Sequence, residues 1–202
     1  MSLLQPLASA ITHRHAKWTA DWHENLAPEN LDLPWSVVEQ NHRMNFELWH
    51  EEDMARRDDL GAERIRQAKR AIDGFNQRRN DAIERLDVWF LSQINMRMDS
   101  PLHSETPGMM IDRLSILALK LYHMRLEATR ESATEEHRRK CSEKAVVLEE
   151  QLSDLAGCLQ ELLNQLQSGT RRFKIYRQFK MYNDATLNPQ LYVKISGGGD
   201  RT

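Results

Sequence analysis

Apolar residues recur every three or four positions over long stretches of the chain, which is the spacing of an amphipathic α-helix. The clearest run begins at Ala145, continues through leucines with coiled-coil spacing to Leu166, and stops at Ser168-Gly169. A second run covers residues 62–98, with Arg79 as one arginine in its apolar seam. Strand-like alternation does not compete with these patterns, so both runs predict long helices.

Three further helices and a terminal one follow from weaker signals. Residues 7–24 are mildly amphipathic, and Pro34 stands at a position where a helix start tolerates proline, which predicts helices over 7–24 and 34–58. Thr106-Pro107 is a capping residue followed by proline, and the helix it starts is apolar all round, as in a central buried helix. A last short helix is predicted over 171–181.

These elements together predict an all-α fold: an antiparallel bundle of four long helices, with short extra helices at the N- and C-termini. The low content of turn formers, Gly 8 and Pro 6 in 202 residues, agrees with few and long helices. We expect one domain over residues 1–202, with a flexible Gly-rich C-terminal tail over 190–202.

Composition narrows the function classes. Lys plus Arg at 28 against Asp plus Glu at 30 gives a net charge of −2, so we expect no general nucleic-acid binding. The most apolar window, residues 109–126, contains charged or titratable side chains that include Asp112, Arg113, Lys120 and His123, so we expect no membrane span. The start of the chain lacks a secretory pattern, and Cys141 and Cys158 lie too far apart on one predicted helix to bridge. These features predict a cytoplasmic protein.

Polar side chains interrupt the apolar faces of three consecutive predicted helices. Burying so many ionisable groups lowers stability unless each finds a partner or a ligand. We therefore predict a buried polar site, while rim ion pairs and one satisfied core histidine stay open as the alternative. The stripes consist of His42, Asn45, Trp49, Asp53 and Arg56 on the first helix, Asp73, Asn76, Asn80, Glu84 and Asp87 on the second, and Asp112, Arg113, Ser115, Lys120 and His123 on the third.

Acid–base chemistry would need carboxylates and imidazoles, and the catalytic candidates are therefore His42, Asp53, Glu84, Asp87, Asp112 and His123. A ligand with phosphate or carboxylate groups would need cations beside aromatic rings and amides. The cationic and aromatic segment near the C-terminus fits this need, although it also fits a helix that docks on the bundle. The binding candidates are Asn45, Trp49, Arg56, Asn80, Arg113, Lys120, Lys174, Tyr176, Arg177 and Lys180.

Metal chemistry is an open alternative. A single divalent ion is predicted at His42, Asp53, Glu84 and Asp87, with ordinary ion pairing as the competing interpretation. Glu84-Arg85-Leu86-Asp87 resembles the Glu-x-x-Asp element of helical nucleotide pyrophosphatases, which implies magnesium. His42 with Glu47-Leu48-Trp49 resembles the active-site helix of tryptophan dioxygenases, with a spacing one residue longer, which implies haem as a further alternative.

Several segments together resemble an uncharacterised bacterial domain-of-unknown-function family, the one numbered four-two-five-four. The resemblance covers most of residues 34–192 and implies a helical protein of similar length. Some members are associated with surface-polysaccharide glycosyltransferases, which implies a sugar or nucleotide-sugar ligand, but the family implies no established activity. The matching segments include Asn45-Phe46-Glu47-Leu48-Trp49-His50-Glu51-Glu52-Asp53, Glu105-Thr106-Pro107-Gly108, Lys120-Leu121-Tyr122-His123-Met124 and Phe179-Lys180-Met181-Tyr182-Asn183-Asp184.

The leading hypothesis is a cytoplasmic helical-bundle protein whose buried polar site binds a small anionic ligand, of a phosphorylated, nucleotide or nucleotide-sugar type, with or without a divalent metal. The first alternative is a non-enzymatic interaction module that forms a homodimer, because the heptad run fits an intersubunit seam as well as an intrachain one. A metal- or haem-dependent oxidase is the second alternative. The sequence leaves open whether the protein is an enzyme.

Overall fold

The computed structural model describes residues 6–27, 29–177 and 186–189. These ranges contain helices and no strand, so the all-α prediction is confirmed. The tail expected over 190–202 and the candidate Lys180 lie outside the described residues. The elements are α1 (Leu7–His23), α2 (Trp35–Ala55), the 3-10 turn η1 (Asp58–Leu60), α3 (Gly61–Gln93), α4 (Pro107–Thr129) and α5 (Glu135–Gln167).

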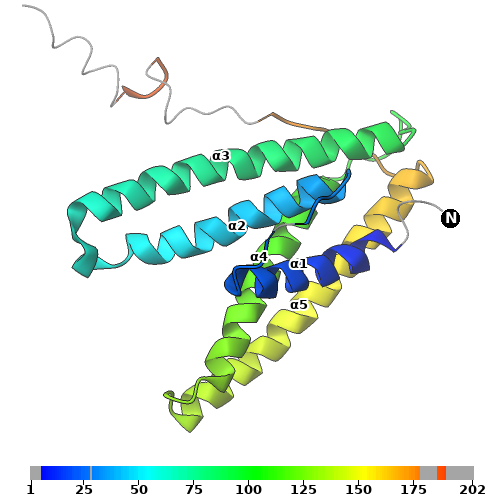
Figure 1. Ribbon diagram of the computed structural model, residues 1–202. Helices are drawn as coiled ribbons and strands as arrows, with labels where there is room; N and C mark the ends of the chain where they lie inside the picture. The colour runs from blue at the N-terminus through cyan, green and yellow to red at the C-terminus, as the bar shows by residue number, and fades with distance from the viewer. Residues whose placement is uncertain (1–5, 28, 178–185, 190–202) are drawn as a thin grey trace, which may run out of the picture.

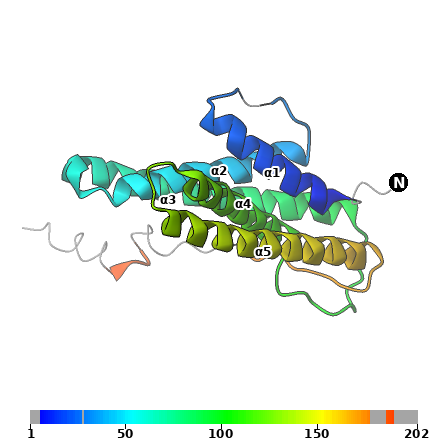
Figure 2. The same cartoon turned by 90° about the horizontal axis from the view of Figure 1, so that it is seen from below.

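The helices form two antiparallel hairpins that lie across one another (Figure 1). One hairpin is α2 with α3, joined through η1, and the other is α4 with α5. The short helix α1 packs on α4 and α5 and also touches α2 (Figure 2). The predicted single four-helix antiparallel bundle is therefore not confirmed, because the two hairpins cross where that bundle would run them side by side.

Local signals in the sequence explain where the second hairpin begins and ends. Thr106 caps α4, and its side-chain oxygen accepts a hydrogen bond from the backbone N–H of Met109, with Pro107 at the first helical position. Thr134 caps α5 in the same way. Gly169, just beyond the end of α5, has φ +72°, a conformation that glycine adopts without strain.

The structure corrects two predictions, the end of the helix over 62–98 and the presence of a helix over 171–181. Helix α3 ends at Gln93, five residues before the predicted end, because Ile94 is extended and packs with Met96 against the core. The predicted helix over 171–181 is wrong where it is described: residues 171–177 are not helical. Arg172 instead pairs with residues 101–103 through backbone hydrogen bonds of 3.1 and 2.8 Å, and Phe173 enters the core.

The core lies where the two hairpins and α1 meet. Helix α4 is central, as its all-round apolar sequence predicts, and Ile111 and Leu114 are fully buried there. The leucines of α5 pack within their own chain, because Leu159, Leu163 and Leu166 are fully buried in the core cluster. The heptad run therefore forms an intrachain seam.

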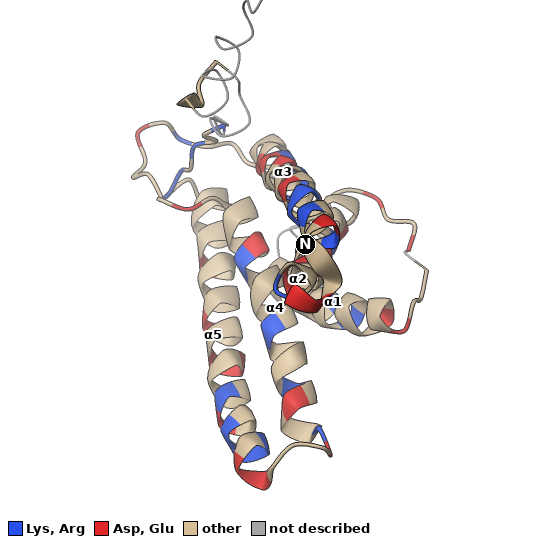
Figure 3. Cartoon of the chain, turned by 90° about the vertical axis from the view of Figure 1, so that its left-hand side faces the viewer, with Lys and Arg blue, Asp and Glu red and all other residues tan. Residues whose placement is uncertain are grey.

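The surface carries both signs of charge. Figure 3 shows basic and acidic residues interspersed along α3 and along the parts of α4 and α5 nearest their connecting loop. Among the described residues, no helix is both long enough and apolar enough to cross a membrane.

Candidate functional site

A network of buried polar side chains occupies the crossing of α2, α3 and α4, and the Asp112 carboxylate is its charged centre. Arg79 on α3 donates from Nε to Asp112 Oδ1 at 2.7 Å and from Nη2 to Oδ2 at 2.5 Å. Asn41 and Asn45 on α2 each donate from Nδ2 to the same Oδ1 at 2.9 Å. Asp112 is only 3% exposed, so these four hydrogen bonds replace its hydration. In return, Asp112 raises the pKa of the Arg79 guanidinium.

The network continues from α2 and α4 to α1. Asn45 Nδ2 lies 2.9 Å from Ser115 Oγ, which lies 2.7 Å from His42 Nδ1. His42 Nε2 lies 2.9 Å from Thr19 Oγ1, and Thr19 bonds to the backbone oxygen of His15 at 2.8 Å. Asp112 and Ser115 share one face of α4 because they are three residues apart. The crossing of three helices is thus spanned by one continuous chain of hydrogen bonds.

The direction of each bond follows from the groups at the ends. A backbone carbonyl only accepts, so Thr19 donates its single hydroxyl proton to His15 and must accept from His42 Nε2–H. Burial holds the pKa of His42 well below its ordinary value, so the ring is neutral and Nδ1 accepts from the Ser115 hydroxyl. Ser115 then accepts from Asn45. Every donor therefore points from Asn45 toward α1.

His15 is buried, and its imidazole ring forms no hydrogen bond with the described residues. Its ring stacks on His42 with centroids 4.4 Å apart, and neither ring nitrogen has a partner among the described residues. Complete burial lowers the pKa of His15 to about 3. A neutral imidazole in this position carries one unsatisfied donor and one unsatisfied acceptor, which is unfavourable in a protein interior.

One side of the Arg79–Asp112 pair faces a pocket of about 380 Å³, which we call the α3–α4 pocket. Its walls come from α3, the start of α4, residues 104–106 and the extended segment 174–176. The predicted site residues that line this pocket are Asn80, Glu84, Asp87, Asp112, Arg113, Lys174 and Tyr176. The structure thus brings together most of the second predicted stripe and part of the cationic segment.

Asp87 is a titratable group of the α3–α4 pocket whose pKa lies far from its ordinary value. Its Oδ1 accepts the Gly108 backbone N–H at 2.7 Å, at the first turn of α4. Burial raises the pKa of Asp87 to about 6, with a further contribution from Glu84, against the opposing effect of the Thr106 and Gly108 hydrogen bonds. A carboxyl with a pKa near neutrality beside cations is suited to donate or accept a proton.

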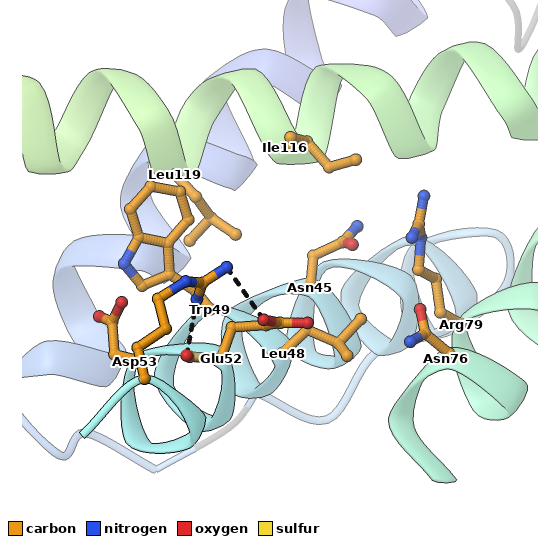
Figure 4. Close-up of a pocket in the computed structure, with 10 residues that line it drawn as sticks. Asn45, Leu48, Trp49, Glu52, Asp53, Asn76, Arg79, Ile116 and Leu119 are labelled. Carbon is orange, nitrogen blue, oxygen red and sulfur yellow. Dashed lines mark hydrogen bonds and ion pairs between the residues drawn. The ribbon is translucent and has the colours of Figure 1, made fainter. Parts of the chain in front are cut away.

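The other pocket in contact with Arg79 is the α2–α4 pocket, with a volume of about 460 Å³ (Figure 4). Leu48, Ile116 and Leu119 supply apolar wall, and Trp49 adds an indole ring. The remaining lining residues are polar: Asn45, Glu52, Asp53, Arg56, Asn76 and Arg79. Figure 4 shows Asn45 and Arg79 toward one end and Trp49 with Asp53 toward the other.

The remaining predicted residues lie apart from these two pockets. His123 stacks on Trp49, with centroids 4.5 Å apart, and belongs to a histidine cluster with His23 and His50. Burial lowers the pKa of His123 to about 4, and repulsion from the other two histidines contributes. Lys120 lines a groove between α4 and α5, and Arg177 lines another beside α3. The single predicted site is therefore divided.

The four predicted metal ligands do not meet. Asp53 lines the α2–α4 pocket, whereas Glu84 and Asp87 line the α3–α4 pocket. Both ring nitrogens of His42 are already bonded to hydroxyls, so neither is free for a metal or for haem iron. In the part of the chain that the structure describes, no three His, Cys, Asp or Glu side chains are placed to hold a metal ion.

Several residues of the network are absent from the predicted set. Arg79 interrupts an apolar seam in the sequence, which indicates a buried partner, but the predicted site does not include it. The structure supplies that partner as Asp112. Asn41 lies one turn before Asn45 on the same face. His15 and Thr19 lie on the buried side of α1 with Ile11 and could not be assigned, because nothing in a weakly amphipathic helix tells which neighbour its polar residues meet.

The fold and the site define an all-helical protein with two crossed hairpins, a buried polar network and a pocket on each side of one arginine. The chain belongs to the family described as Protein of unknown function (DUF4254), whose model matches residues 35–175. The matched part contains α2 to α5, every residue that lines the α2–α4 pocket and all but Tyr176 of those that line the α3–α4 pocket, whereas α1 precedes it. No curated protein and no solved structure matches the chain.

Proposed function

We propose that the protein binds a small phosphorylated ligand in the α3–α4 pocket. The observation that carries this proposal is the convergence of three cations from three separate segments, Arg79, Arg113 and Lys174, on a pocket that also holds Asp87. The volume of about 380 Å³ lies in the range of small-molecule sites, which is roughly 300–1,000 Å³.

The hydrogen bonds of the cations support an anion site although carboxylates surround them. Arg79 uses one N–H of Nε and one of Nη2 on Asp112, so three of its five N–H groups, two on Nη1 and one on Nη2, have no acceptor among the described residues. Arg113 contacts Glu105 through Nη1 alone, at 2.7 and 2.9 Å. Each guanidinium is thus oriented by a carboxylate and keeps N–H groups for an oxygen-rich ligand. Lys174 forms no ion pair with the described residues and adds an exposed positive charge at the pocket wall.

Asp87 gives the α3–α4 pocket a group for proton transfer as well as for binding. With a pKa of about 6, its carboxyl is partly protonated near neutral pH, so it is able to donate a hydrogen bond to a phosphate oxygen or to accept a proton from a ligand hydroxyl. This role predicts that ligand binding changes with pH around 6. An enzyme would use the same group as an acid or base.

Isothermal titration calorimetry with inorganic pyrophosphate, glucose 1-phosphate and uridine diphosphate tests the proposal. We expect at least one of these probes to bind the wild type, and Arg113→Ala to weaken it about 10- to 100-fold, since hydrogen bonds to charged groups contribute about 1.5–3 kcal/mol. Binding of none of the three would refute the anion site.

Arg125→Ala is the matched control. Arg113 and Arg125 are both on α4, both are more than half exposed, and each pairs with one glutamate, at 2.7 and 2.8 Å. Only Arg113 lines the α3–α4 pocket. Equal loss of affinity in the two variants would show that net charge, and not this pocket, attracts the probe.

A homodimer is a second proposal, carried by a different observation. The heptad seam is intrachain, but Val146 and Val147 are 63% and 52% exposed side by side on α5. We infer that a second copy covers this pair. Light scattering after size exclusion should then give twice the 23.7 kDa chain mass, and Val146→Glu should return it to one chain mass. A wild type of one chain mass would refute the dimer.

A further inference from the structure

The buried network fixes the polar groups that Asn45 and Arg79 turn toward the α2–α4 pocket. The Asp112 carboxylate can only accept, so the amide atom of Asn45 beside it must be the nitrogen, and both Nδ2 protons are used on Asp112 and Ser115. The amide oxygen therefore faces away from the network. No described residue donates to Asn45 Oδ1, which leaves it as an acceptor on a side chain that lines the α2–α4 pocket.

Arg79 stands beside it as a donor. Its Nε and the Asn45 Nδ2 both bond to Asp112 Oδ1, at 2.7 and 2.9 Å, so the guanidinium and the amide are neighbours around one oxygen. Arg79 Nη1 has no acceptor among the described residues, and Arg79 lines the pocket. The pocket lining thus includes a donor and an acceptor without described partners, on two side chains that one buried carboxylate holds side by side.

The rest of the pocket is suited to a flat and partly apolar body. Trp49, Leu48 and Leu119 line it together with Ile116, and the volume of about 460 Å³ is large enough for one heterocycle with a small substituent. The Trp49 indole is itself held by a parallel stack on His123, with an interplanar angle of 1°. A rigid aromatic wall beside a rigid donor–acceptor pair selects for shape as well as for hydrogen bonding.

We propose that the α2–α4 pocket binds a planar heterocycle that carries an adjacent hydrogen-bond acceptor and donor, as the lactam edge of a pyrimidine or purine base does. Arg79 Nη1–H donates to the ring carbonyl, and Asn45 Oδ1 accepts from the neighbouring ring N–H. The proposal does not rest on the phosphorylated ligand of the α3–α4 pocket, because the two pockets have separate walls apart from the shared Arg79.

Uracil and 1,3-dimethyluracil are the probes, because both are flat rings and only uracil has N–H donors. Titration of the wild type, followed by protein NMR shifts, should give saturable binding of uracil and at least tenfold weaker binding of dimethyluracil, as expected when Asn45 is left without its donor. Equal affinity for both rings would overturn the proposed edge recognition, and a lack of saturable uracil binding would overturn the site.

Two variants outside the hydrogen-bonded network locate the binding. Ile116 lines the α2–α4 pocket and the groove between α4 and α5, whereas Leu117 lines that groove only. Ile116→Trp should fill the pocket and lower uracil affinity at least tenfold, and Leu117→Trp should leave it within about twofold. Equal effects of the two variants would place the probe in the groove and overturn the assignment.

Arg79→Lys tests the donor itself. Lysine keeps the charge beside Asp112 but has no second N–H edge to present to a ring, so uracil affinity should fall while the thermal midpoint shows that the fold persists. Unchanged uracil affinity in a folded Arg79→Lys protein would overturn the role of Arg79. Arg113→Ala, which tests the phosphorylated ligand, should leave uracil binding unchanged, so the two proposals fail separately.

Discussion

Replacing His15 with leucine should raise the free energy of unfolding, and should raise it more at pH 5 than at pH 7. At pH 7 the neutral ring leaves one donor and one acceptor buried without partners, and each such group is worth about 1–3 kcal/mol. Leucine has a similar volume and no polar atom. After allowance for the lost stack on His42, a gain of about 1 kcal/mol or more is expected at pH 7.

The pH dependence has a definite sign. The pKa of His15 is about 3 in the folded chain, against 6.5 as its ordinary value, so the unfolded chain binds the proton more readily. The stability of the wild type is therefore complete above pH 6.5 and is lost as the pH falls toward 3. Between pH 7 and pH 5 this one group removes about 2 kcal/mol, which the His15→Leu protein keeps.

Urea unfolding followed by tryptophan fluorescence at the two pH values measures both effects. His13→Leu is the control, because His13 is on the same helix and exposed, and its replacement should change stability by less than about 0.5 kcal/mol at either pH. A stability difference between wild type and His15→Leu that is the same at pH 5 and pH 7 would refute the buried neutral histidine. A loss of stability at pH 7 would show that the ring nitrogens have partners.

Asp87→Asn should remove a decline in stability of up to about 3 kcal/mol that the wild type shows as the pH rises from 4 to 7, because the folded pKa of about 6 exceeds the ordinary 3.8; urea unfolding across this range measures it. Gly108→Ala should cost about 1–3 kcal/mol, since a Cβ there would lie 2.6 Å from a backbone oxygen of α3, whereas Gly157→Ala, with open space around it in α5, should stabilise by about 0.5–1 kcal/mol in the same assay. Asp112→Asn should lower the free energy of unfolding by about 3–5 kcal/mol, because it leaves the largely buried Arg79 cation without a counter-charge. Wild-type stability in that variant would show that the pair is dispensable.

The sequence predicted the helices well where the signal is local. The Thr106-Pro107 start and the glycine stop after α5 are set by backbone chemistry within a few residues, and both were found where expected. The crossing of the hairpins was not predictable in the same way, because periodicity gives the buried face of a helix but not the angle at which that face meets another. The helix predicted around Phe173 is wrong for a related reason. Burial of the Phe173 ring and backbone pairing with residues 101–103 outweigh the helical pattern of this segment.

The candidate site shows the same limit. Polar residues on apolar faces need partners, so the sequence indicates Asp112, His42 and Asn45 as site residues, and the structure pairs all three. The stripes could not show that Asp53 and Asp87 would face different pockets, since helical wheels place residues around an axis without placing the axes. Arg79, which joins the two pockets, was visible only as an exception in an apolar seam.

The ordered hydrogen bonds at the crossing of α2 and α4 also determine how these helices can move. Apolar side chains tolerate a helix that slides by a fraction of a turn, because one methyl group replaces another at little loss. A chain that begins at the Asp112 carboxylate and ends at the His15 carbonyl has no such freedom, since a shift breaks its hydrogen bonds and leaves buried donors and acceptors without partners. The polar chain therefore fixes the axial positions of α1, α2 and α4 relative to one another, so a shift of one of these helices breaks buried hydrogen bonds unless the other two move with it.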